Sequence, residues 1–174
     1  MWYAIRTTEH REAEVAGAIK RLVPDGLYSD IWIPMKEMAI RRRGIYEVDT
    51  VVLFLGFVFI KTEEPWKIHK YICFADNYIG FVKTGSEFMA IDGYDRDMFD
   101  KLRNMPGVLN MSRAVIRNGM AHVESGPLMG MDEKIVRVDR HRRKAWVVFN
   151  SPLCHDGRLA LGLEITDSEA GVSF

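Results

Sequence analysis

The chain has 174 residues, and 24 Lys and Arg balance 24 Asp and Glu, so its formal net charge is zero. An apolar fraction of 48% excludes a wholly disordered chain, while the neutral total points neither to nor away from nucleic acid. Cys73 and Cys154 have no CxxC spacing, which argues against a zinc or disulfide scaffold and favours a reducing cytoplasm. The most apolar stretch, 51–60, is too short to span a bilayer, so we expect a protein that is neither exported nor membrane-bound.

The first hundred residues alternate between strand and helix patterns. Short aromatic or β-branched runs predict strands, and apolar residues at helical spacing predict helices, the first of which Thr7 or Thr8 could cap. The elements expected in chain order are a strand at 2–6, a helix at 9–23, a strand at 31–34, a hairpin of 38–42 and 46–54, a strand at 55–61, a helix opening at 64–65, a strand at 79–82 and a helix at 95–105. This order predicts an α+β fold in which an antiparallel sheet is flanked by helices.

Pro106 and Gly107 mark a change of pattern, because helical periods end there and short strands follow. Strands are expected at 121–123, 134–139, 144–150 and 158–164, on the scale of a small five-stranded β-barrel. We therefore expect an N-terminal domain at 1–106, a linker at 107–117, a barrel at 118–166 and an acidic, polar tail at 167–174.

Three separated stretches resemble one family, in its order and spacing. Residues 2–5 (WYAI) resemble the opening strand of the NusG N-terminal (NGN) domain, and 53–60 (LFLGFVFI) resemble its Leu-Phe-Pro-Gly-Tyr-Val segment. Residues 119–130 (GMAHVESGPLMG) resemble the KOW motif. The resemblance covers nearly the whole chain and implies an NGN domain followed by an SH3-like KOW barrel.

Several positions depart from the family pattern. Leu55 stands where the family usually has Pro, Phe57 where it has Tyr, and Met120 where it has Asp. Glu133 replaces a loop glycine, which leaves either a strained loop or a rebuilt turn. Residues 138–145 (VDRHRRKA) and 162–165 (GLEI) are most similar to the LoaP-type specialised paralogues.

The resemblance implies that the N-terminal domain binds the clamp region of RNA polymerase through an apolar depression. By motif position, the contacts would come from Trp2, Tyr3, Phe54 and Phe57. The alternative is that these aromatic side chains belong to the core, since alternate residues of a strand face opposite sides.

Two basic segments are candidates for nucleic-acid contact. The hairpin tip carries Arg41, Arg42 and Arg43, which could bind upstream or non-template DNA or an acidic loop of polymerase. The alternative is a solvated turn whose charges prevent aggregation. Residues 134–144 contain six cationic residues and one acidic residue, and Trp146 follows closely. Such a basic segment with an adjacent indole could bind the backbone of nascent RNA and stack a base, unless Trp146 belongs to the core. The RNA-binding candidates are Lys134, Arg137, Arg140, His141, Arg142, Arg143 and Lys144.

No catalytic constellation, cofactor site or metal site is expected. His69 and Cys73 lie four residues apart, but two ligands do not complete a metal site. The expected function is that of a monomeric, cytoplasmic bacterial elongation and antitermination factor, associated with the nucleoid through polymerase, whose KOW domain contacts a nascent RNA hairpin. The alternatives are a general NusG factor that couples polymerase to Rho or ribosomal protein S10, and a KOW-type protein that binds RNA or the ribosome.

Overall fold

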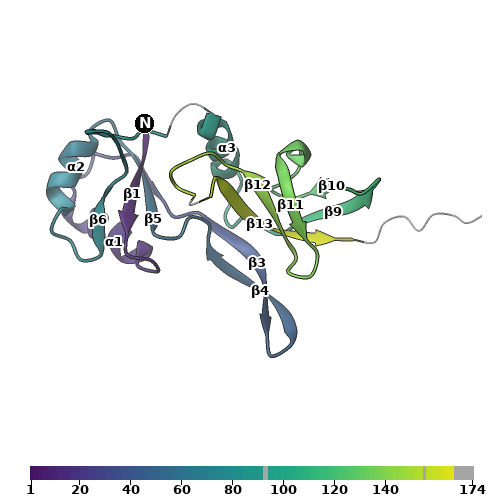
Figure 1. The fold of residues 1–174 in the computed structure, drawn as a ribbon. Coiled ribbons are helices and arrows are strands. Elements are labelled where there is room, and N and C mark those ends of the chain that lie inside the picture. Colours follow the sequence, from purple (N-terminus) through teal and green to yellow (C-terminus); the bar gives the residue numbers. More distant parts are fainter. Residues whose placement is uncertain (92–93, 155, 167–174) are drawn as a thin grey trace, which may run out of the picture. The chain divides into compact units, whose positions relative to one another are not determined.

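The computed structural model describes residues 1–91, 94–154 and 156–166 (Figure 1). The expected tail at 167–174 lies outside the described residues. The chain divides into two compact units, the first of Met1–Pro34 and Val52–Phe99, and the second of Met35–Val51 with the described part of Asp100–Phe174. The first unit contains helices and strands and the second consists mostly of strands, and the units do not follow the predicted boundary at residue 106.

The first unit is built on a four-stranded sheet in the order β2-β5-β1-β6. The elements of this unit are β1 (Trp2–Thr7), α1 (Glu12–Leu22), β2 (Asp30–Trp32), β5 (Phe57–Lys61), α2 (Pro65–Ile72), β6 (Tyr78–Phe81) and the short pair β7 (Lys83–Thr84) and β8 (Glu87–Phe88). Helix α3 (Tyr94–Arg103) follows. Strand β5 lies between β2 and β1, and its run Phe57 to Ile60 is buried on both faces, as the apolar sequence predicts.

Helices α1 and α2 cover one face of this sheet. Val15 and Ile19 of α1 and Ile68 and Ile72 of α2 are buried against Ile5 and its neighbours, which gives each helix the expected i, i+4 apolar stripe. Tyr71, the neighbour of Ile72 on α2, is 48% exposed and lies outside this stripe. The predicted cap is wrong: β1 runs on through Thr7, and α1 begins after Arg11 without a side-chain cap.

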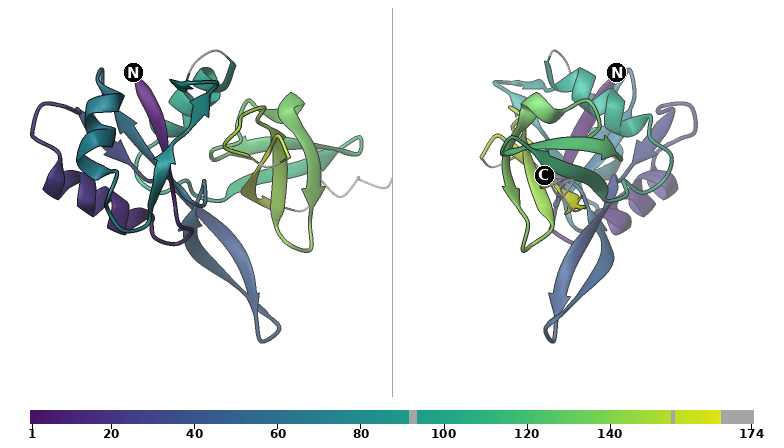
Figure 2. Two further views of the ribbon diagram at one scale, coloured as in Figure 1. Left: turned by 60° about the vertical axis from the view of Figure 1, so that its left-hand side comes forward. Right: turned by 90° about the vertical axis from the view of Figure 1, so that its right-hand side faces the viewer.

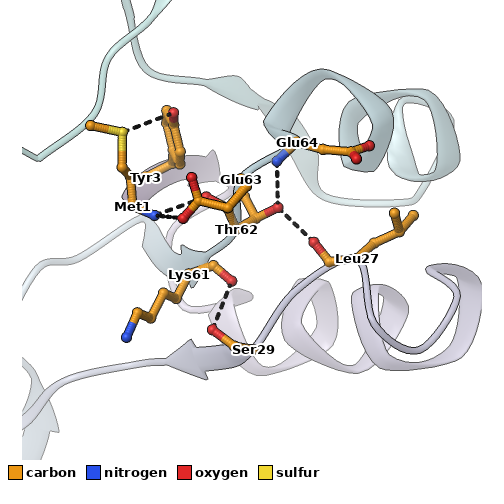
Figure 3. Close-up of polar contacts among 8 residues, drawn as sticks. All are labelled: Met1, Tyr3, Leu27, Ser29, Lys61, Thr62, Glu63 and Glu64. Carbon is orange, nitrogen blue, oxygen red and sulfur yellow. Dashed lines mark hydrogen bonds and ion pairs between the residues drawn. The ribbon is translucent and has the colours of Figure 1, made fainter.

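Polar contacts tie the N-terminus to the end of β5 (Figure 3). The Met1 ammonium group lies 2.6 Å from the Glu63 carboxylate and donates to the Thr62 carbonyl at 3.1 Å. The buried Thr62 hydroxyl donates to the Leu27 carbonyl at 2.6 Å and accepts from the Glu64 N–H at 2.9 Å. Thr62 therefore joins three segments at the start of α2, where Pro65 occupies the first turn.

The second unit contains a long hairpin and a curled five-stranded sheet (Figure 2). The hairpin strands are β3 (Met35–Arg42) and β4 (Ile45–Val52), joined at Arg43 and Gly44, whose φ angles are 49° and 86°. The sheet has the order β10-β9-β13-β12-β11 and forms the predicted barrel. Its elements are β9 (Ser112–Arg117), β10 (Met120–Ser125), the 3₁₀ turn η1 (Asp132–Lys134), β11 (Ile135–Asp139), β12 (Lys144–Val148) and β13 (Arg158–Ile165).

Strand β9 corrects the sequence analysis, which placed residues 112–117 in a linker. It pairs antiparallel with β10 and parallel with β13, and so lies between them in the barrel. The pattern was hidden because the buried position at its start is polar. Ser112 is fully buried, and its hydroxyl accepts a hydrogen bond from the Leu128 N–H at 3.0 Å.

The loop before β11 settles the question raised by Glu133. This residue lies in the 3₁₀ turn η1, and it is not among the residues with positive φ. The Asp132 carboxylate of the same turn accepts from the Val123 N–H at 2.7 Å, which ties the loop to β10. Glu133 therefore causes no left-handed strain in this loop.

Candidate functional site

One face of the first unit's sheet carries a layer of aromatic rings, called here the aromatic face. Trp2, Phe57 and Phe59 share this face, because the register pairs Arg6 with Phe57 and Ala4 with Phe59. The Trp2 and Phe99 ring centroids lie 5.7 Å apart, and Trp32 is 5.0 Å from Phe99 in an edge-to-face arrangement. Trp2 and Trp32 remain partly exposed.

The structure separates the four residues predicted to contact polymerase. Tyr3 points to the opposite side of the sheet, into the core beneath α1 and α2. Phe54 and Phe57 are 2% and 7% exposed, so both are buried, and the Phe54 ring centroid lies 5.4 Å from that of Phe59 in the aromatic face. Of the four, Trp2 is the one that reaches the surface, and sequence reasoning missed its neighbour Trp32, although a Trp in a short strand was a visible signal.

The hairpin tip presents the predicted arginines to solvent. Arg41, Arg42 and Arg43 are all exposed. The Arg42 guanidinium lies 2.5 Å from the Asp49 carboxylate on the facing strand, and the Arg41 guanidinium lies 6.0 Å from the centroid of the Tyr46 ring. Arg41 and Arg43 are therefore the cations of this tip that the carboxylate of Asp49 does not neutralise.

The barrel carries a second basic group at residues 140–143, called here the basic turn, which connects β11 to β12. Arg140, His141 and Arg142 are exposed, and Arg143 adopts a left-handed conformation with φ 48°. The Asp139 carboxylate accepts from the Arg142 N–H at 2.9 Å. This hydrogen bond, with the nearby positive charges of Arg142, Arg137 and Lys144, holds the pKa of Asp139 below its usual value. The one acidic residue of the segment thus shapes the turn.

Trp146 lies on the outer surface of the barrel beside this turn. Its strand neighbours Ala145 and Val147 are buried, whereas Trp146 itself is partly exposed, which answers the question of whether it is core. The Arg137 guanidinium lies 4.9 Å from the Trp146 ring, and the Lys144 ammonium lies 4.5 Å from it. An accessible indole between two cations combines a stacking surface with phosphate-binding charges.

Lys134 does not join this cluster. It ends η1 at the start of β11, whereas the basic turn follows the end of that strand. Lys134 instead lies near Lys101, whose pKa is lowered by burial and by the Lys134 charge. The other predicted RNA-binding residues lie at one end of β11 and β12 or directly along them.

His69 and Cys73, the pair of possible metal ligands at the end of α2, have separate hydrogen-bond partners. His69 Nδ1 is 2.6 Å from the Tyr78 hydroxyl, whose pKa is raised by burial, and Cys73 contacts the Lys70 carbonyl instead of His69. Within residues 1–91, 94–154 and 156–166, no three His, Cys, Asp or Glu side chains come together as metal ligands. The same described residues include no helix long and apolar enough to cross a membrane.

A family model described as "Transcription termination factor nusG" matches residues 1–100, more than half of the chain. The chain belongs to the NusG family. Proteins of this family are transcription factors, and the matched residues include the aromatic face but not the basic turn. A comparison with curated protein sequences finds no match.

A solved structure supports the fold. The structure described as "Domain interaction in Thermotoga maritima NusG" is 17% identical, with a TM-score of 0.60 over 94% of this chain and 92% of that chain. At this identity the likeness shows the NusG fold alone. A chain of the MjSpt4:Spt5 complex in conformation B is also 17% identical, over 93% of this chain and 92% of that chain, but its TM-score of 0.35 carries no argument.

Proposed function

We propose that this NusG-family chain is a transcription elongation factor that binds RNA polymerase through the aromatic face and contacts nascent RNA through the barrel. Polymerase binding would favour the elongating conformation over paused or terminating ones, which is a shift of populations without chemistry. The outcome expected of it is processive elongation and antitermination. The observation that supports the RNA contact best is Trp146, partly exposed between Arg137 and Lys144 and next to the basic turn.

The polymerase contact rests on family membership and on the partly exposed indoles of the aromatic face. Partly exposed Trp side chains are typical binding hot spots, since each buries a large apolar area at little entropic cost. Trp2 and Trp32 lie side by side, with ring centroids 6.4 Å apart. We therefore expect contact through these two rings, with Phe54 and Phe57 contributing as buried members of the core.

Capture of core RNA polymerase by the full chain tests the first contact. Trp2→Ala and Trp32→Ala should each weaken capture by about 10-fold or more. Phe74→Ala is the matched control, because Phe74 is 96% exposed and lines a groove with Gly17 and Leu22 of α1, on the helix side of the sheet. Unchanged capture by both Trp variants, with thermal unfolding showing a folded chain, would exclude this face.

RNA binding by the full chain tests the second contact. The triple variant Arg140→Gln, Arg142→Gln, Arg143→Gln should abolish binding to an RNA hairpin at moderate salt, because removing a cation that touches a phosphate lowers both the affinity and its salt dependence. Lys20→Gln with Arg21→Gln on α1 is the control for loss of surface charge, since both side chains are exposed in the first unit. Equal weakening in the triple variant and the control would mean that the RNA contact is not at the basic turn.

A further inference from the structure

The hairpin and the basic turn meet at Tyr46, a residue of β4 that neither predicted site included. The Arg41 guanidinium of β3 lies 6.0 Å from the Tyr46 ring centroid, and the Arg143 guanidinium of the basic turn lies 5.3 Å from it. Tyr46 is partly exposed, as is Arg143. One aromatic ring therefore has a cation from the hairpin and a cation from the barrel beside it.

Hydrogen bonds and close packing hold the hairpin against the barrel within the second unit. The Lys36 ammonium of β3 donates to the Ala160 carbonyl of β13 at 2.6 Å, although Lys36 is only 9% exposed. The Glu37 N–H donates to the Leu109 carbonyl at 2.8 Å, and the Glu37 carboxylate accepts from the Met111 N–H at 3.0 Å. The approach is so close that a Cβ on Gly162 would lie 2.7 Å from the Glu37 carbonyl oxygen.

Trp146, like Tyr46, has an aromatic ring with two cations beside it, and it lies on the same outer surface. Lys144 and Trp146 pair with Gly162 and Ala160, so they share the face of the sheet that β3 covers at β13. The two rings are joined through consecutive residues, since Arg143 contacts Tyr46 and Lys144 contacts Trp146. In order, the surface presents Arg41, Tyr46, Arg143, Lys144, Trp146 and Arg137.

We propose that the hairpin and the barrel form one continuous binding site for a single-stranded nucleic acid. Bases stack on Tyr46 and Trp146, and the backbone phosphates lie against the four cations that flank and join the rings. This pattern suits a single strand, because unpaired bases expose their faces for stacking whereas duplex bases do not. The inference deepens the proposed RNA contact, on which it rests, by extending the site from the barrel to the hairpin.

Two acids lie near the four cations of this surface, Glu164 beside Arg143 and Asp139 near Arg137 and Lys144, so cations remain in excess. The Glu164 carboxylate lies 3.4 Å from the Arg143 guanidinium, with both side chains about two-fifths exposed. Exposed ion pairs of this kind contribute little to stability, so a phosphate can replace the Glu164 carboxylate as the partner of Arg143. Arg137, Arg41 and Lys144 each contact an aromatic ring, and the sequence places no acid between Arg140 and Lys144.

Fluorescence anisotropy of the full chain with labelled oligouridine and oligodeoxythymidine tests the site. Strands of about 4 and about 12 nucleotides distinguish one ring from two, given the usual site sizes of single-strand binders. Tyr46→Ala should weaken binding of the longer strand by roughly 5- to 150-fold, the usual effect of removing one stacking ring, and remove most of its advantage over the shorter strand. Tyr46→Phe, which keeps the ring, should retain the affinity.

Ile45→Ala is the matched control, because Ile45 is the neighbouring hairpin residue, 68% exposed, and points to the other side of β4. Arg41→Gln should reduce the salt slope of binding by about 0.7, the value for one phosphate contact with a single strand. Tighter binding of the uridine strand identifies a transcript as the ligand, and tighter binding of the thymidine strand identifies displaced DNA. Either result supports the composite site when Tyr46→Ala also weakens binding of the preferred strand.

Two outcomes would overturn the inference and leave the proposed RNA contact standing. The first is an unchanged affinity in Tyr46→Ala together with weaker binding in Trp146→Ala, which would confine the site to the barrel. The second is stronger competition by duplex RNA than by the single strand, which would exclude stacking on the two rings. If the wild-type chain binds neither strand and no RNA hairpin, the proposed RNA contact itself fails.

Discussion

Gly162→Ala tests whether the hairpin lies against the barrel. The added Cβ would meet the Glu37 carbonyl oxygen and the Met111 Cγ, both at 2.7 Å, although ordinary contacts begin near 3.4 Å. One of these atoms belongs to the backbone of β3, which cannot rotate away as a side chain can. The strand therefore has to move by several tenths of an ångström, and overpacking of this kind costs about 1–3 kcal/mol.

Urea unfolding measures this cost as a lower midpoint with an unchanged slope. Gly17→Ala is the control, since its Cβ would have no neighbour within 4 Å in α1, and a Gly-to-Ala change in a helix interior should raise stability by about 0.5–1 kcal/mol. The same Gly162 variant should bind the longer oligonucleotide more weakly, because β3 carries Arg41. An unchanged midpoint and unchanged binding would refute the close approach of β3 to β13.

Three further predictions concern buried groups. Burial lowers the pKa of Lys36 from 10.5 to about 8, so between pH 8 and 10.5 the unfolded chain binds more protons than the folded chain. The free energy of unfolding should therefore rise with pH in this range, by about 3 kcal/mol at most relative to Lys36→Met, in parallel urea titrations. The same pH profile for both proteins would show that Lys36 is not buried. Glu12→Ala should lower the free energy of unfolding by about 1–3 kcal/mol in thermal or urea unfolding, because the buried Gly56 N–H loses its acceptor at 2.6 Å. Glu12→Gln keeps an oxygen at this place and should recover most of that stability. Equal destabilisation in both variants would rule out the hydrogen bond. Phe54→Ala should cost about 3–5 kcal/mol, whereas Phe74→Ala should stay within about 0.5 kcal/mol; a small effect at Phe54 would place it at the surface.

Local patterns in the chain were enough to predict most strands and helices, the family and the places where charge gathers. A strand repeats every two residues and a helix every three to four, so both patterns are local in the sequence. The apolar run at 57–60 and the apolar stripe of α1 could therefore be predicted directly from the sequence. The hairpin tip at Arg43 and Gly44 was readable for the same reason, since turns have their own residue preferences. The basic turn was visible as a run of charges.

Which of those residues can act together depends on tertiary packing. Alternation along a strand does not say which side faces solvent, so only packing showed Tyr3 and Phe54 buried and Trp146 accessible. A register shift between Ile135 and Arg137 sets Arg137 opposite Trp146, and the sequence around it contains no sign of this shift.

The placement of Tyr46 depended most on tertiary contacts. Its two cationic neighbours come from β3 and from a turn about a hundred residues later in the chain, and β9 likewise pairs with β13 across the length of the barrel. Such contacts arise from the packing of whole elements and leave no periodic trace in either segment. Two basic segments that are separate in the sequence are therefore joined, in the folded chain, through one aromatic ring.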